Sequence, residues 1–355
     1  MNETSLKDVL NRLYAADVPD KADIEYALSI QEPANMAELF AFADNVRRQY
    51  IGDGILLRGI IEFSNFCDNT CKYCGLNKTN TNLKRYKLTD KQVLNCVRQI
   101  AVAGIGTVVL QSGEQADIDT HRFAGLIREI KTRFDIAITL SIGEKTFDDY
   151  ALWKKTGADR YLLKIETTNR RLYQSLHPQM SFDNRLKCSD DLAILGYQNG
   201  SGNIIGLPGQ TISDIAGDVL FFASHKFDMI GIGPFIPHPD TVLRDCPAGN
   251  VELVLKTIAV TRIVTKNAHL PATTAIGSLN GIDHRPAALA AGANVLMPNF
   301  TPQPFRQLYE IYPGKRCITE VPGTCGLCMD AMAAAIGRTI DLSRGDSLKK
   351  RNKCA

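Results

Sequence analysis

Three cysteines on one short loop constrain this chain more than any other feature of its sequence. They are Cys67, Cys71 and Cys74, spaced C-x3-C-x2-C, and they follow directly after the apolar, β-rich run at residues 59–63. Three thiolates on one loop can hold three corners of a cubane iron–sulfur cluster and leave the fourth iron without a protein ligand. The spacing therefore predicts a metal-holding loop at the end of a buried strand.

An iron atom with an open position can be chelated by the amino and carboxylate groups of S-adenosylmethionine (SAM). The cluster can then pass one electron into the sulfonium, which breaks a carbon–sulfur bond and leaves a 5′-deoxyadenosyl radical. Zinc usually takes four ligands, commonly from two separated C-x2-C pairs. A C-x2-C redox pair would leave Cys67 unexplained. We therefore favour the [4Fe–4S] radical SAM cluster over a zinc or purely structural site.

Composition excludes several other classes of protein. The formal net charge is only +3, which indicates no nucleic-acid partner. The N-terminus lacks the apolar core of a signal peptide, and the longest apolar run, near residues 287–298, is too short to span a membrane. Ten cysteines, six of them in two tight clusters, favour metal binding over disulfides. We therefore expect a cytoplasmic protein.

The order of predicted elements indicates an α/β fold. Helical patterns cover residues 3 to 50, and a T-x-x-Q capping box at Thr89 and Gln92 opens another helix. Apolar strands alternate with helices from residue 55 onward; the expected strands are 56–63, 106–112, 136–141, 160–166, 202–206, 228–234, 271–276 and 293–298. Eight such units predict a complete (β/α)8 TIM barrel at residues 51–300, with an N-terminal helical cap at 1–50 and a C-terminal extension at 301–355.

In such a barrel the chemistry lies on the loops at the carboxyl ends of the strands. Polar or small residues fall at those positions in several consecutive units. They are Gln111, Ser112, Gly113 and Glu114 after the second strand, Thr139 and Ser141 on the third, Lys164 and Glu166 on the fourth with Arg185 in the next helix, Ile204 on the fifth, and Thr273 and Thr274 on the seventh. Together they offer complementary groups for one zwitterionic nucleoside.

Several motifs then resemble those of the HydE family, radical SAM maturases of [FeFe]-hydrogenase in the biotin synthase-like group. They include FSNFCDNTCKYCGL, NLKRY, VVLQSGE, SGNIIGLPGQT, DMIGIGPFIPHPDT, PATTAIG and GANVLMPN, and the resemblance spans about residues 40 to 340. It implies a closed barrel with an internal cavity and a role in building the diiron subcluster of the hydrogenase. It also implies a small iron–cysteine–CO–CN substrate, HydG-like and HydF-like partner maturases, and a ferredoxin or flavodoxin type electron donor.

Carried over residue by residue, the resemblance makes Cys67, Cys71 and Cys74 the cluster ligands. Tyr73 packs on the adenine side, Glu166 and Arg185 bind SAM, and Ser112-Gly113-Glu114 replaces the superfamily's Gly-Gly-Glu. Lys164 stands where we associate the family with arginine, and lysine offers a point charge instead of a fork. Residues expected to line the cavity or hold substrate are Arg58, Gln111, Thr139, Thr273, Thr274, Met297 and Tyr309.

A second group of cysteines, Cys317, Cys325 and Cys328, lies beyond the predicted barrel with spacing C-x7-C-x2-C. It resembles the auxiliary site, [2Fe–2S] or [4Fe–4S], that some of these maturases carry. A zinc site or free thiols is the alternative reading of this group.

Three competing functions have the same cysteine loop. A biotin synthase-like enzyme would keep a second cluster inside the barrel on strand cysteines, and the later predicted strands carry none. A methylornithine synthase would need carboxylates for the ammonium groups of lysine, whereas the threonines of the seventh strand suit a small anion better. A non-catalytic iron–sulfur scaffold would not turn over SAM.

Overall fold

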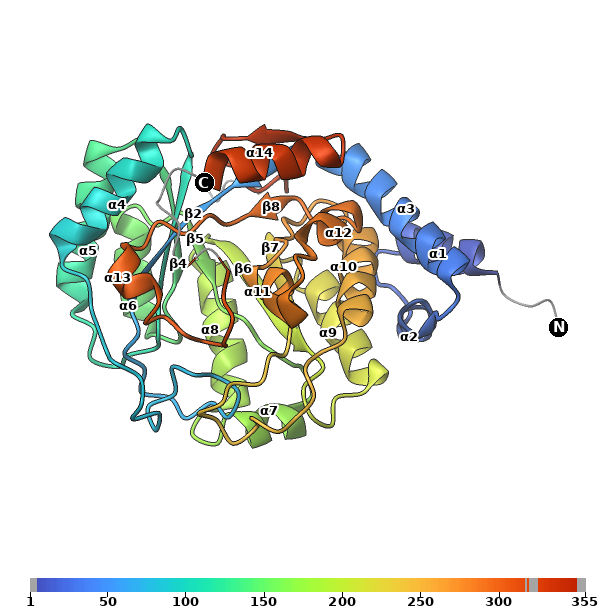
Figure 1. Ribbon diagram of the computed structural model, residues 1–355, viewed down its shortest axis with the longest axis horizontal. Coiled ribbons are helices and arrows are strands. Elements are labelled where there is room, and N and C mark those ends of the chain that lie inside the picture. The colour runs from blue at the N-terminus through green and yellow to red at the C-terminus, as the bar shows by residue number, and fades with distance from the viewer. Residues whose placement is uncertain (1–4, 317, 319–324, 350–355) are drawn as a thin grey trace.

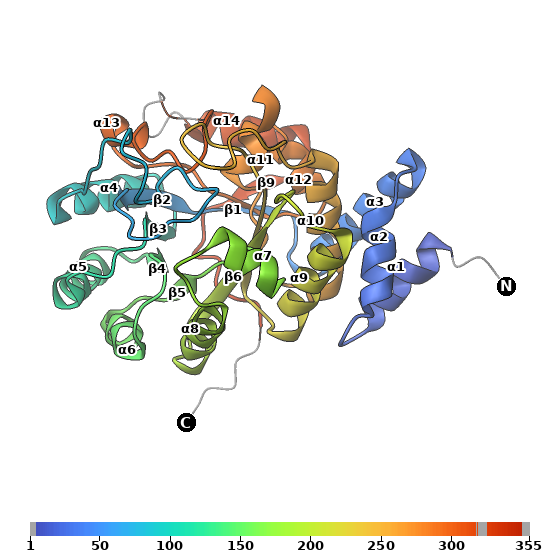
Figure 2. The ribbon, with the colours of Figure 1, turned by 90° about the horizontal axis from the view of Figure 1, so that it is seen from below.

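The computed structural model describes residues 5–316, 318 and 325–349, apart from the side chains of 325–327. From residue 59 onward, parallel strands alternate with helices that lie outside them (Figures 1 and 2). These elements are β2 (Gly59–Ser64), α4 (Asp90–Val102), β3 (Thr107–Ser112), α5 (Thr120–Arg133), β4 (Ala137–Ser141), α6 (Phe147–Thr156), β5 (Arg160–Leu162), α7 (Arg170–Leu176), α8 (Phe182–Ile194), β6 (Gln198–Ile205), α9 (Ile212–Ser224), β7 (Met229–Pro234) and α10 (Val251–Thr265).

The strands form two parallel sheets. The larger runs in the order β2-β3-β4-β5-β6-β7, and the smaller runs β8-β1-β9, from β1 (Gly54–Leu57), β8 (Val295–Leu296) and β9 (Thr339–Asp341). Isolated parallel bridges join the two sheets, at Ile60–Asn299 on one side and through Met229–His269 and Pro271–Val295 on the other. The α/β prediction with parallel strands is confirmed, but the described strands do not make one closed eight-stranded sheet.

The predicted seventh strand, 271–276, is wrong. Pro271 makes a single bridge, and the chain then turns into helix α11 (Thr274–Ser278), whose N-cap is Thr273. The Thr273 side chain accepts a hydrogen bond from the Ile276 backbone N–H, and proline cannot donate to a sheet ladder. Local capping therefore overrides the β-rich composition. Short elements complete this region: η1 (Leu279–Gly281), α12 (Arg285–Ala290) and α13 (Gln303–Arg306).

The first predicted strand, 56–63, divides at Arg58 into β1 and β2. β1 pairs with β8 and β9, whereas β2 pairs with β3, so the run changes sheet at this residue. Arg58 is thereby placed between the two sheets, where its side chain is buried.

The N-terminal helices are as predicted: α1 (Leu6–Ala15), α2 (Lys21–Ser29) and α3 (Pro33–Tyr50). They pack beside α9 and α10, on one flank of the strands (Figures 1 and 2). The capping box at Thr89 and Gln92 of α4 is also confirmed.

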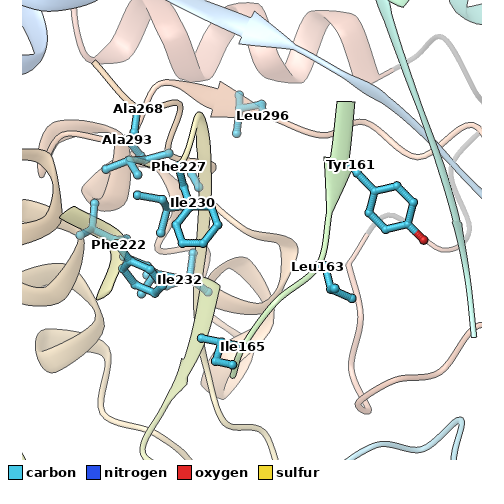
Figure 3. Close-up of a cluster of buried hydrophobic side chains, with 14 of the residues drawn as sticks. Tyr161, Leu163, Ile165, Phe222, Phe227, Ile230, Ile232, Ala268, Ala293 and Leu296 are labelled. Carbon is cyan, nitrogen blue, oxygen red and sulfur yellow. The ribbon is translucent and has the colours of Figure 1, made fainter. Parts of the chain in front are cut away.

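Apolar side chains fill the space between the strands and the helices. Figure 3 shows this packing, with Phe222 of α9 and Ile230 and Ile232 of β7 beside Phe227, and Ile165 from the chain after β5. All of these side chains are buried, so the strands are fixed from outside by a continuous core.

The C-terminal segment covers the amino ends of the strands. The Arg344 carbonyl oxygen accepts from the hydroxyl of Thr107, the first residue of β3, at 2.8 Å and from Arg160, the first residue of β5, at 2.6 Å. Arg160 also forms an ion pair with Asp346 at 2.7 Å. This end is therefore closed by residues 344–347, and the opposite end carries the loops that form the site. Helix α14 (Cys325–Ala335) precedes β9.

Candidate active site

A cavity of about 380 Å³ begins among the loops at the carboxyl ends of the strands and extends down to Arg58. It brings together every residue that the sequence predicted for the cluster, SAM or substrate, the tail cysteines excepted. These residues are Arg58, Cys67, Cys71, Tyr73, Cys74, Gln111, Ser112, Gly113, Glu114, Thr139, Ser141, Lys164, Glu166, Arg185, Ile204, Thr273, Thr274, Met297 and Tyr309.

The cysteine loop is held by polar contacts to its backbone. The guanidinium of Arg85 donates to the carbonyl oxygens of Asn65, Leu76 and Asn77 at 2.7–2.8 Å. The side chain of Asn65 donates to the carbonyls of Lys84 and Leu308. The loop is therefore shaped by the chain itself before any metal is bound.

The three thiols are free and lie close enough to influence one another's ionisation. Burial and the neighbouring Cys67 raise the pKa of Cys71 to about 12, and burial with the other two thiols raises the pKa of Cys74. Burial also raises the pKa of Cys67. Thiolates gathered in this way need a cation to stabilise them. Three sulfur ligands facing one cavity fit a cluster that keeps one iron open.

Gly113 lets the end of β3 pack directly against this loop. A Cβ at this position would lie 2.2 Å from the carbonyl oxygen of Phe66 and 2.8 Å from the Cβ of Cys67. The loop is also joined to β3 by hydrogen bonds from Asp68 N–H to the Glu114 oxygen and from Gly113 N–H to the Ser64 oxygen. Glycine is required at position 113 so that β3 can pack against the cysteine loop. This requirement is independent of any contact between Gly113 and a ligand.

Arg185 lies between two carboxylates at the cavity wall. Its Nε is 2.8 Å from Glu144 Oε1, and its Nη2 is 3.7 Å from Glu114 Oε2. Burial by itself would lower the pKa of Arg185, but Glu114, Tyr173 and Glu144 outweigh it and raise that pKa. Sequence reasoning missed Glu144, although it follows the end of β4 and the same strand-end rule would have found it.

Lys164 and Glu166 form an ion pair, with Nζ and Oε2 separated by 2.9 Å. Glu166 has a φ of 63°, in the left-handed region that residues other than glycine rarely adopt. β5 ends at Leu162, so Glu166 lies in the segment beyond the strand. Its left-handed backbone conformation sets the direction of its side chain. Lys164 is thus paired with a carboxylate two residues further along the chain.

Tyr73 is fixed by His177, which sequence reasoning did not assign to the site. The Tyr73 hydroxyl lies 2.9 Å from His177 Nε2, and His177 Nδ1 lies 3.0 Å from the Tyr173 carbonyl oxygen. The carbonyl only accepts, so Nδ1 carries the proton and Nε2 accepts from Tyr73. Burial and the charge of Arg185 lower the pKa of His177 to about 4, which keeps the ring neutral.

The deeper part of the cavity contains two buried polar atoms that, among the described residues, have no hydrogen-bond partner. They are Arg58 Nε and Thr139 Oγ1, and the two side chains are only 4% and 2% exposed. The other Arg58 nitrogens contact Met229 Sδ at 2.7 Å and the Gly345 oxygen at 3.3 Å. Burial and the charge of Arg160 lower the pKa of Arg58. Buried polar atoms without partners indicate a place for a ligand.

Glu62 and Lys315 form a buried ion pair in the cavity wall that the sequence did not predict. Glu62 also accepts from Asn299 Nδ2 at 2.8 Å, and the Lys315 ammonium lies 5.1 Å from the centre of the Tyr309 ring. The Tyr309 hydroxyl in turn accepts from Gln111 at 3.2 Å. Glu62 therefore joins Glu114 and Glu166 in the cavity wall.

Each of those carboxylates has a cation beside it: Lys315, Arg185 and Lys164 respectively. Within the described part of the chain, Arg58 makes no ion pair with a carboxylate. The cavity therefore has balanced charges near the cysteines and one buried, unbalanced cation at its deep end.

The prediction for the tail cysteines falls mostly outside the described residues. Cys317 lies outside the described residues, as does the side chain of Cys325, while Cys328 on α14 is exposed. Over the ranges that the structure covers, no helix combines the length and apolarity that crossing a membrane would require.

Comparisons with known proteins bear on the family and the fold of this chain. The radical SAM superfamily model matches residues 61–222. The "[FeFe] hydrogenase maturase subunit HydE" of Thermotoga maritima is 47% identical over 315 residues, which cover 89% of this chain and 90% of that protein. A crystal structure of methylornithine synthase (PylB) has a TM-score of 0.83 at 26% identity, covering 95% of this chain and 97% of that one. A crystal structure of the maturase HydG shares the fold, with a TM-score of 0.77 at 20% identity over 96% of this chain and 80% of that one.

Proposed function

This chain belongs to the HydE maturases of the radical SAM superfamily, and we propose that it acts on a small anionic iron complex during assembly of the diiron subcluster of [FeFe]-hydrogenase. The single observation that carries the substrate class is that the buried cation Arg58 and the unpartnered hydroxyl of Thr139 line the same cavity. Hydroxyls donate to anionic ligands, and arginine stays charged at any working pH.

Cys67, Cys71 and Cys74 would hold the [4Fe–4S] cluster, since their thiols line the cavity beside the SAM-facing strand ends. The bound cluster and SAM together supply a 5′-deoxyadenosyl radical by reductive cleavage of the sulfonium. The chain's own part is to hold the three sulfurs on a loop braced by Arg85 and Gly113.

The charged pairs near the cysteines are suited to a zwitterion. Glu114 would meet the SAM ammonium, while Lys164 and Arg185 would meet its carboxylate. Glu166 and Ser141 would bind the ribose, and Ile204 and Tyr73 would flank the adenine. Support comes from the lining of one cavity by all of these groups and from the fixed hydroxyl of Tyr73.

Below this region, Arg58, Thr139, Thr273 and Thr274 would hold the iron–cysteine–CO–CN complex, with Gln111, Met297 and Tyr309 completing the wall. Methylornithine synthase chemistry is the competing function, because that fold is similar over nearly the whole chain. A lysine substrate would need carboxylates free to meet its ammonium groups. Glu114 and Glu166 are assigned above to SAM, and Glu62 is held in a buried pair with Lys315, which favours the anionic substrate.

Further features of the proposal concern the whole chain. We infer a complete barrel at residues 51–300, supported by the bridges that join the two sheets. An auxiliary [2Fe–2S] or [4Fe–4S] site would use Cys317, Cys325 and Cys328, whose C-x7-C-x2-C spacing is the support for it. HydG-like and HydF-like maturases and a ferredoxin or flavodoxin would be partners in the cytoplasm, where the free thiols would stay reduced.

Complementation tests the proposal. In a strain lacking its own HydE maturase, the wild-type chain should restore hydrogenase activity. Arg58→Met and the Thr273→Val/Thr274→Val pair should weaken that rescue without abolishing SAM binding. Arg133→Met is the matched control, because Arg133 is an exposed arginine paired with Glu129 on α5. If the wild-type chain does not complement and forms methylornithine from lysine, the proposal is wrong and the competing function is correct.

A further inference from the structure

Asp218 of α9 is a buried carboxylate that accepts three hydrogen bonds, two from Thr168 and one from Asn203 of β6. Asp218 Oδ1 accepts from the Thr168 backbone N–H at 2.6 Å and from the Thr168 hydroxyl at 2.7 Å. Asp218 Oδ2 accepts from Asn203 Nδ2 at 2.9 Å. The Asp218 side chain is fully buried, so these contacts form in a medium where such bonds are costly to lose.

The two partners of Asp218 flank Glu166 on both sides. Thr168 follows Glu166 by two residues, and Asn203 pairs with Glu166 through an isolated parallel bridge. The Glu166 N–H donates to the Gly202 oxygen at 3.0 Å, and the Ile204 N–H donates to the Glu166 oxygen at 3.1 Å. The Asn203 carbonyl also accepts from the Lys164 ammonium at 3.3 Å.

Glu166 adopts its left-handed φ of 63° between these contacts. A strained backbone of this kind persists only where surrounding contacts over-determine it. Asp218 bonds to Thr168, two residues after Glu166, and to Asn203 on the strand that pairs with Glu166. These contacts hold the backbone on both sides of Glu166.

We propose that Asp218 is a positioning residue for the nucleoside site: it fixes Glu166 and Ile204 in place and thereby sets the affinity for SAM. The inference rests on the proposed function, in which Glu166 and Ile204 contact SAM. Asp218 has no proposed role in holding the cysteine loop. Substitutions that remove its hydrogen bonds should therefore change the affinity for SAM and leave the iron content of the cluster unchanged.

The Asn203 amide offers an unusually direct test, because Asn203 Oδ1 has no hydrogen-bond partner among the described residues. In Asp218→Asn, the new amide oxygen can still accept from Thr168. Its NH2 can donate to Asn203 Oδ1 after the Asn203 amide rotates. Asn203→Asp alone would instead place two carboxylates face to face. Combining it with Asp218→Asn restores one donor and one acceptor at the contact.

The readouts are the dissociation constant for SAM, from the SAM-induced change in the electron paramagnetic resonance of the reduced cluster, and iron content after reconstitution. We expect Asp218→Ala and Asn203→Asp each to weaken SAM binding by about tenfold or more, with iron content at the wild-type level. Asp218→Asn and the Asn203→Asp/Asp218→Asn double variant should lie within about threefold of wild type. Asp214→Asn is the control, since Asp214 on the same helix contacts Thr211 and Asn169 but not Asn203.

Wild-type affinity in Asp218→Ala, or a double variant no better than Asn203→Asp, would overturn the inference. If Asp218→Ala does not fold, the comparison of Asn203→Asp with the double variant decides the matter alone. A wild-type protein whose reduced cluster does not respond to SAM would instead refute the proposed function.

Discussion

Replacing Lys315 by methionine should destabilise the protein strongly, because it leaves the carboxylate of Glu62 buried without its cation. The side chains of Glu62 and Lys315 are only 3% and 8% exposed. Removing one partner of a buried pair costs about 3–5 kcal/mol, whereas replacing both by neutral groups costs much less. With an unfolding entropy of about 2.1 cal/mol/K per residue, a chain of 355 residues should lose roughly 4–7 °C in Tm.

The measurement is thermal unfolding of the metal-free protein for Lys315→Met, Glu62→Gln and the double variant. The double variant should recover much of the loss, since no uncompensated charge remains. Lys21→Met is the matched control: its exposed pair with Glu25 lies along one helix, and its loss should cost about 0.5 kcal/mol or less. A Lys315→Met protein as stable as this control, or a double variant less stable than either single, would refute the reasoning.

Three further outcomes follow from the site. Because the pKa of His177 is about 4 in the fold against 6.5 outside it, the unfolded chain takes up the proton first. Stability of the metal-free protein should therefore fall as pH drops from 6.5 to 4, by on the order of 3 kcal/mol, and His177→Gln should reduce that loss. Thr139→Val should change unfolding stability by less than about 1 kcal/mol, since its hydroxyl lacks a partner among the described residues, yet weaken hydrogenase rescue. Gly113→Ala should lower iron content after reconstitution because its Cβ would meet the Phe66 carbonyl, whereas Gly125→Ala, with open space around it, should not.

The site was more predictable from sequence than the sheet. Parallel strands end at the same edge, so polar residues at strand ends converge whatever the details of pairing, and Glu114, Thr139 and Glu166 do line one cavity. Thr273 also lines that cavity although the strand predicted there is a helix cap. Thr273 reaches the cavity because of the order of strands and helices along the chain. The hydrophobic periodicity of the sequence predicted that order correctly.

What the sequence could not indicate depends on pairing between distant residues. Glu62 and Lys315 are 253 residues apart in the chain, and a lone glutamate in an apolar strand gives no sign of its partner. The same holds for Asp218, whose contacts with Thr168 and Asn203 exist only once α9 lies behind β6. His177 follows the end of α7, and its bond to Tyr73 spans 104 residues.

The distribution of charge along the cavity gives the two proposed ligands different surroundings. β2 runs for six residues between Arg58 and the cysteine loop, which at about 3.3 Å per residue separates the two by roughly 20 Å. Near the cysteines the wall presents carboxylates beside cations, an arrangement that a zwitterion can enter by exchanging partners at little electrostatic cost. At the deep end Arg58 is a buried cation that burial and Arg160 both disfavour. An anion bound there would remove that cost, whereas a cationic substrate would add to it. Under the proposed function, the deep end would therefore select against lysine while SAM occupies the region near the cysteines.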